Sequence, residues 1–65
     1  MRSGDRGPAV TAVQRLLAVH GHLIDKDGSF GTSTAQAVGA FQQEQRLATD
    51  SVVGPDTWAA LLSQA

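Results

Sequence analysis

The residues with the most evident chemical potential lie in one short stretch. Asp25, Asp27 and Ser29 place oxygen atoms at alternate positions, as in the first half of a calcium-binding loop. Such a loop needs glycine at position 6 and a bidentate glutamate at position 12, where this chain has Phe30 and Gln36. The other interpretation is a turn in which Asp27 accepts hydrogen bonds from nearby backbone N–H groups. The missing ligands favour the turn, and a small calcium-binding domain is kept as an alternative.

A second candidate for metal chemistry is the histidine pair, His20 and His22. A zinc site needs further ligands at suitable spacings, and the only acids nearby are Asp25 and Asp27. Two partly exposed histidines at a helix end are the favoured interpretation. Serine, histidine and aspartate all occur, but neither a nucleophile elbow nor a glycine-rich phosphate loop is present. We therefore predict no catalytic residue, metal or cofactor.

Composition narrows the function classes. The chain has 65 residues, no cysteine, a formal net charge of −1 and 42% apolar residues, which together predict one small folded domain over 1–65 without disulfides. No apolar run is long enough to span a membrane. A helix-turn-helix DNA binder is disfavoured, because the second predicted helix carries only Glu44 and Arg46 and the third only Asp56. Neither a nucleic acid nor a membrane is expected as a partner.

The elements that must position these residues show an internal repeat. An aspartate, a glycine and a threonine recur at the same spacing, 23 residues apart, each time before a helical segment. The two sets are Asp27, Gly31 and Thr34, and Asp50, Gly54 and Thr57. Each set predicts a turn that leads into a helix, with hydroxyls such as that of Thr34 available to cap it.

Apolar periodicity and glycine–proline pairs predict three helices, over about 8–20, 32–46 and 55–63, after a flexible arm at 1–6. The fold class is therefore all-α: a compact three-helix bundle with two similar turn–helix repeats and short connectors. No strand pattern is long enough for a sheet.

The sequence predicts how four particular residues pack. Phe30 lies in a surface turn, so its ring should plug the core, and Leu23 should fold back from the first connector. Gly39 costs a helix about 1 kcal/mol relative to alanine, which indicates that another helix packs closely there. Trp58 should fill the core while its edge reaches a groove.

These residues also carry a family resemblance. The chain closely resembles the peptidoglycan-binding domain found beside catalytic domains in bacterial cell-wall hydrolases and phage endolysins. The matching stretches cover almost the whole chain and are 4–10, 13–17, 21–23, 27–31, 34–38, 40–42, Leu47, Asp50 and 53–58. Two departures are Ser51, where the family often has glycine, and Gly39, where a charged residue is common.

The resemblance implies a monomeric three-helix module without catalysis of its own. It implies noncovalent binding to the glycan or the stem peptide of peptidoglycan (murein), which would hold a tethered catalytic domain at the cell wall. The location would be extracellular or cell-wall associated within a larger protein, including a phage protein released at lysis. The alternative is a prodomain-like or protein-interaction module that covers a neighbouring enzyme. The family also forms the propeptide of animal matrix metalloproteases, but the inhibitory cysteine that follows it there is missing here.

We predict that the ligand groove combines backbone groups, hydroxyls, amides and an apolar floor around the first turn. The predicted lining residues are Leu23, Asp27, Ser29, Phe30, Thr34, Gln42 and Trp58. Asp25 or Asp27 would meet an amine of the stem peptide. The competing hypothesis is that Asp27 and Thr34 are purely structural, because both repeats keep these residue types.

Overall fold

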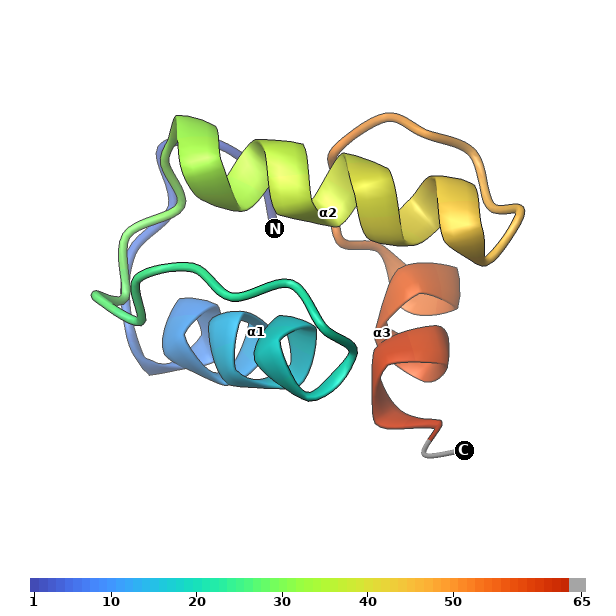
Figure 1. Cartoon of the computed structure of the whole chain (residues 1–65). Coiled ribbons are helices and arrows are strands. Elements are labelled where there is room, and N and C mark those ends of the chain that lie inside the picture. Colours follow the sequence, from blue (N-terminus) through green and yellow to red (C-terminus); the bar gives the residue numbers. More distant parts are fainter. Residues whose placement is uncertain (64–65) are drawn as a thin grey trace.

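The computed structural model describes residues 1–63 and contains three helices: α1 (Pro8–Val19), α2 (Thr32–Glu44) and α3 (Pro55–Leu62) (Figure 1). These bounds lie within two residues of the predicted ones, and the all-α three-helix fold is confirmed. α1 packs against both α2 and α3. Within residues 1–63, none of the helices combines the length and apolar character needed to cross a bilayer.

All three helices begin after a glycine. The residues at the N-terminal boundaries are Gly7, Gly31 and Gly54. Pro8 and Pro55 occupy the first helical position, as predicted, where a proline loses no intrahelical hydrogen bond. Among residues 1–63, no side chain caps any of these helix starts. The expectation of a hydroxyl cap on α2 is therefore wrong, and the Thr34 hydroxyl has another partner.

The first two helices end alike. The second residue after each helix adopts a left-handed conformation: Gly21 after α1, with φ 94°, and Arg46 after α2, with φ 60°. The next N–H then returns to a carbonyl of the last helical turn, at 2.8 Å in both helices. After α2, Arg46 thus adopts a conformation that glycine, as at Gly21 after α1, adopts with less strain.

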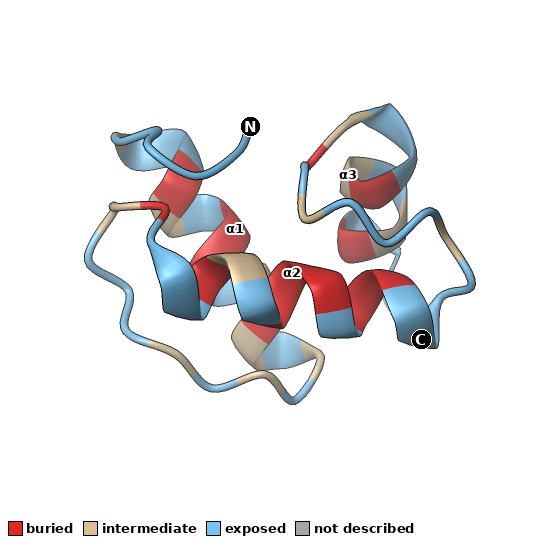
Figure 2. Ribbon diagram, turned by 90° about the horizontal axis from the view of Figure 1, so that it is seen from above, coloured by how far each residue is buried: buried red, intermediate tan, exposed pale blue. Residues whose placement is uncertain are grey.

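The core lies between the three helices, and the buried faces of all three point into it (Figure 2). Phe30 is 1% exposed, which confirms that its ring plugs the core from the first connector. The expectation for Leu23 is wrong: it is 81% exposed, and the next residue, Ile24, packs against the core instead. Trp58 is half-buried against the core.

The segment 1–6, expected to be a flexible arm, is instead held by backbone hydrogen bonds. These bonds join Gly4 to Phe30 (3.0 Å), Phe30 to Asp5 (2.9 Å) and Val53 to Met1 (2.7 Å). The segment thereby ties both connectors together, and Met1 packs on the core. Its polar sequence gave no sign of this, because the bonds use backbone groups alone.

Gly39 is explained by a connector rather than by a helix. A Cβ atom at this position would lie 3.1 Å from the Ser51 Oγ and 3.7 Å from the Thr49 Cγ2. The close approach predicted from the glycine exists, but the expected partner is wrong. The 45–54 connector, which follows α2, folds back onto it.

Candidate functional site

A buried glutamine holds the first turn (residues 27–34) in shape. The Gln14 side chain is fully buried on α1, and its Nε2 lies 3.1 Å from each of three acceptors. These acceptors are the Asp27 Oδ1, the Ser29 carbonyl and the Thr34 Oγ1. The Gln14 Oε1 accepts the Gly28 N–H at 3.0 Å. One amide group therefore fixes the start, middle and end of the turn.

The two oxygen atoms of the Asp27 carboxylate have different surroundings. Its Oδ1 accepts from Gln14 and from the Ser29 N–H, the latter at 3.0 Å. The Ser29 N–H, and then the Gln14 amide, lower the pKa of Asp27 below its ordinary value, so the side chain is anionic at neutral pH. Its Oδ2 accepts no hydrogen bond from residues 1–63, and the residue is exposed. Asp27 can therefore shape the turn and still offer one oxygen to a ligand.

The second turn (residues 50–57) repeats this network. The Gln42 Nε2 donates to the Asp50 Oδ1 (3.0 Å), the Val52 carbonyl (2.9 Å) and the Thr57 Oγ1 (3.1 Å). The Gln42 Oε1 accepts the Ser51 N–H at 3.0 Å. Hydrogen bonds from Val52 and Gln42 lower the pKa of Asp50 in the same way. The shared geometry confirms that both turns are built alike.

Each turn also forms a small hollow. The first, of about 170 Å³, is lined by 25, 27, 29 and 31–34, and the second, of about 220 Å³, includes the residues 23 positions later. Because the hollows recur at matching positions, they follow from the repeated backbone. They do not by themselves single out a ligand site.

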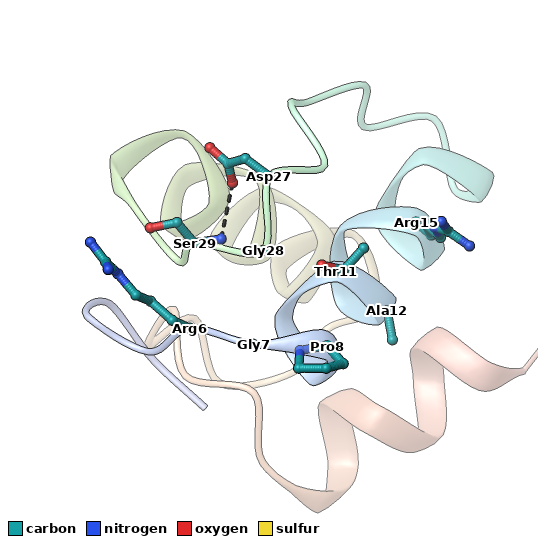
Figure 3. A pocket seen from close by; sticks show the side chains of 9 residues that line it. All are labelled: Arg6, Gly7, Pro8, Thr11, Ala12, Arg15, Asp27, Gly28 and Ser29. Atoms are coloured by element: carbon teal, nitrogen blue, oxygen red, sulfur yellow. Dashed lines mark hydrogen bonds between the residues drawn. The ribbon is translucent and has the colours of Figure 1, made fainter.

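The first turn alone borders a much larger groove, of about 890 Å³, between the turn and the start of α1 (Figure 3). We call this the arginine groove; it is lined by Arg6, Gly7, Pro8, Thr11, Ala12, Arg15, Asp27, Gly28 and Ser29. Arg6 stands at one end beside Ser29, and Arg15 stands at the other. Charged groups, hydroxyls and a short apolar floor meet here, which suits a small polar ligand.

The peptidoglycan binding domain is the family whose model matches this chain, over residues 6–61. The chain belongs to the peptidoglycan-binding domain family. It is 38% identical to an N-acetylmuramoyl-L-alanine amidase of Bacillus licheniformis, over 94% of this chain but only 18% of the amidase. The domain thus spans less than a fifth of that relative.

Solved structures agree with this assignment. The domain is similar to part of the Burkholderia AP3 phage endolysin, with a TM-score of 0.95 and 41% identity over 97% of this chain and 24% of the endolysin. It is also similar to part of a fused Zn-dependent amidase/peptidase/peptidoglycan-binding protein of Clostridium acetobutylicum. That match has a TM-score of 0.97 and 34% identity, over 100% of this chain and 29% of the other. A peptidoglycan-binding domain is a binding module found fused to catalytic domains.

Some of the predicted site residues lie at the surface of the peptidoglycan-binding domain, and others lie in its interior. Asp27 and Ser29 lie together in the arginine groove, whereas Leu23 lines a separate shallow hollow beside the start of α2. Three others, Phe30, Thr34 and Gln42, are at most 3% exposed. Their side chains point into the folded domain, where the Thr34 hydroxyl and the Gln42 amide bond within the two turns. Trp58 packs on the core from α3 and lines none of the hollows described above.

Sequence reasoning missed Gln14, Arg6 and Arg15. Gln14 had a usable signal, because it stands on the apolar face of its helix, next to Val13, as Gln42 stands next to Phe41. The equivalence of the two glutamines is not evident from the sequence, because their distances to the bonded threonine differ. Gln14 precedes its threonine by 20 residues and Gln42 by 15. The arginines gave no local pattern, since the fold brings them together from different segments.

The two histidines have structural partners in the domain. The His22 Nε2 lies 2.9 Å from the Glu44 Oε1, which links the ends of α1 and α2. The His20 Nε2 lies 3.0 Å from the Leu61 carbonyl, and its ring packs on Phe41. Within residues 1–63, no group of three histidine, aspartate or glutamate side chains could hold a metal ion.

Proposed function

We propose that this domain binds bacterial murein noncovalently through the face around the first turn, and that it keeps an attached wall-lytic enzyme on its insoluble substrate. The observation that carries this proposal is the arginine groove, which joins a polar, charged surface to the first turn, where the sequence predicts the ligand groove. The family assignment and the enzymes that contain similar domains support it. The domain itself would contribute binding and no catalysis.

Tethering explains why a modest surface would suffice. A shallow groove on a 65-residue domain cannot enclose a ligand as an enzyme cleft does, so its affinity for one repeat unit should be weak. Murein repeats the same chemistry many times, and attachment raises the local concentration of a linked enzyme without new contacts. The proposed place of action is therefore the cell wall, outside the membrane, as part of a larger protein.

Within this proposal, the accessible members of the predicted set have distinct roles. Asp27 and Ser29 would contact the ligand directly, and Leu23 would add a contact in its separate hollow of about 370 Å³. The buried residues Thr34 and Gln42 would keep the two turns rigid, so that little conformational entropy is lost on binding.

Sedimentation with purified sacculi tests the proposal. We expect the folded domain to pellet with sacculi at low and at moderate salt and to stay in the supernatant with chitin or cellulose. Heat-denatured domain serves as the control for trapping in the pellet. A folded domain that remains in the supernatant with sacculi at low salt would contradict the proposed function.

A further inference from the structure

The cationic side chains of this domain are unevenly placed. The chain has five lysine and arginine residues and a formal net charge of −1, yet Arg6 and Arg15 both line the arginine groove. Both residues are exposed, and within residues 1–63 neither guanidinium pairs with a carboxylate. The only ion pair in that part of the chain joins His22 to Glu44. Two guanidinium groups are thus available to a ligand in one groove.

The arrangement of the charges limits which ligand fits. Arg6 and Arg15 stand at opposite ends of the groove, with Thr11 and Gly28 between them and Asp27 along one side (Figure 3). The free Oδ2 of Asp27 adds one negative charge between the two positive ends. A complementary ligand carries two anionic groups that are separated along its length, and a cationic group between them.

The second turn provides an internal comparison. Aligning Gln14 with Gln42 places Arg15 opposite Gln43 on α2, and the hollow at the second turn is lined by no lysine or arginine. The glutamine network and the lowered aspartate pKa are common to both turns. Folding the turn therefore does not require the arginines, so their position beside the first turn is available for a role in binding.

We infer that the arginine groove binds the carboxylates of a murein stem peptide, with Arg6 and Arg15 as their partners and Asp27 receiving the side-chain amine of the peptide. This inference rests on the proposed function and specifies its ligand as peptide rather than sugar. A guanidinium donates two parallel hydrogen bonds to a carboxylate, a geometry that an uncharged N-acetyl sugar cannot use. The groove also has no aromatic side chain on which a sugar ring could pack.

Peptide titrations followed by NMR and calorimetry test the inference. The probe is the acetylated tetrapeptide L-Ala-γ-D-Glu-L-Lys-D-Ala with free carboxylates, and its matched control is the same peptide with both carboxylates converted to carboxamides. We expect amidation to raise the Kd for the wild-type domain by about tenfold or more, since charge-assisted hydrogen bonds become neutral ones. This arm uses only wild-type protein, so no folding defect can affect it.

A second arm uses a charge-matched pair of variants. Arg6→Gln with Arg15→Gln should raise the Kd of the free-carboxylate peptide by about tenfold or more, and should bind the carboxamide peptide as the wild type does. Arg2→Gln with Arg46→Gln removes the same two charges outside the groove and should change the Kd by less than about twofold.

Three results would overturn the inference. The first is equal affinity of the wild type for both peptides, or no NMR shift at about 10 mM free-carboxylate peptide. The second is a groove variant that binds the peptide as tightly as the control variant. The third is tighter binding of a peptide-free glycan or of a glycerol-phosphate oligomer. Any of these can occur while the wild type still pellets with sacculi, so the inference can fail while the proposed function stands.

Discussion

The two turns of this domain share one folding device and differ in what surrounds it. In both, a buried glutamine amide binds an aspartate, a backbone carbonyl and a threonine at 2.9–3.1 Å. Only the first turn borders the arginine groove, whereas the second has a hollow about a quarter of that volume. The comparison teaches that the repeated residues build both turns, and that the candidate site combines the repeated Asp27 with Arg6 and Arg15, which have no basic counterpart around the second turn.

The two turns also differ at the point where each contacts a helix. The side chain at this contact comes from the helix at the first turn and from the turn itself at the second. At the first turn, Gly28 (φ 74°) faces Thr11 of α1. At the second, Ser51 (φ 57°) faces Gly39 of α2. Each contact has room for one side chain, so a glycine stands on one side of it. This exchange explains both departures from the family pattern, the serine in the turn and the glycine in the helix.

The largest expected effect comes from breaking either glutamine network. Gln14→Leu and Gln42→Leu should each lower the free energy of unfolding by about 2–4 kcal/mol, because several buried groups of a turn lose their partner at once. Chemical denaturation measures this, with exposed Gln43→Leu as the control, expected within about 0.5 kcal/mol of wild type. If one network variant were as stable as the control, the two turns would not be equivalent.

The glycine exchange predicts effects of opposite sign at equivalent positions. Gly28→Ser should destabilise by about 2 kcal/mol, because φ is positive and a Cβ would lie 2.9 Å from the Thr11 Oγ1. Ser51→Gly should stabilise by about 0.5–1 kcal/mol, since it relieves the left-handed strain.

A double-mutant cycle sharpens this comparison. Gly39→Ala should gain close to the full helix-propensity difference of about 1 kcal/mol when Ser51→Gly has removed the serine hydroxyl. With Ser51 present, the gain should be smaller, because the new Cβ would lie 3.1 Å from the Ser51 Oγ. Equal gains in both backgrounds would show that the two positions do not compete for space.

Acid titration is expected to give the smallest effect. The lowered pKa values of Asp27 and Asp50 mean that the folded domain holds fewer protons than the unfolded chain in mildly acidic solution. This stabilisation is complete above the ordinary aspartate pKa of 3.8 and is lost as the pH falls through the lowered values. The Tm should therefore drop below about pH 4.

Asparagine variants test whether the Asp27 and Asp50 carboxylates cause the drop in Tm in acid. Asp27→Asn and Asp50→Asn keep the side-chain carbonyl oxygen, so each should retain the turn and remove a similar part of the acid-dependent drop in Tm. If the double variant lost as much Tm in acid as the wild type, these carboxylates would not be the source. Unequal single effects would indicate that the second turn holds its carboxylate differently.

Much of the fold could be predicted from the sequence because its signals are local. Helix bounds follow from glycine–proline pairs and apolar periodicity, and the plug residue Phe30 follows from an aromatic ring in a polar turn. The outcome for Leu23 was not predictable in this way, because Leu23 and Ile24 are both apolar and only packing decides which one turns inward.

The site was harder to predict because it is assembled from distant segments. Asp27 and Ser29 were found through the turn they form, but Arg6 reaches the groove through the bonded N-terminal segment and Arg15 through α1. Thr34 and Gln42 were predicted to line the ligand groove, but both side chains are buried. Their burial shows that a polar residue on an apolar face can serve the fold, here by bonding to the turn.

The most direct test of the account is sacculus sedimentation with one matched pair of variants. Ala12 lies in the arginine groove, and its counterpart on α2, Ala40, is also exposed but lies outside that groove. Ala12→Trp should fill the groove and leave most of the domain in the supernatant, while Ala40→Trp should pellet with sacculi as the wild type does. If both variants pelleted equally, or if only Ala40→Trp lost binding, the assignment of the site to the first turn would be contradicted.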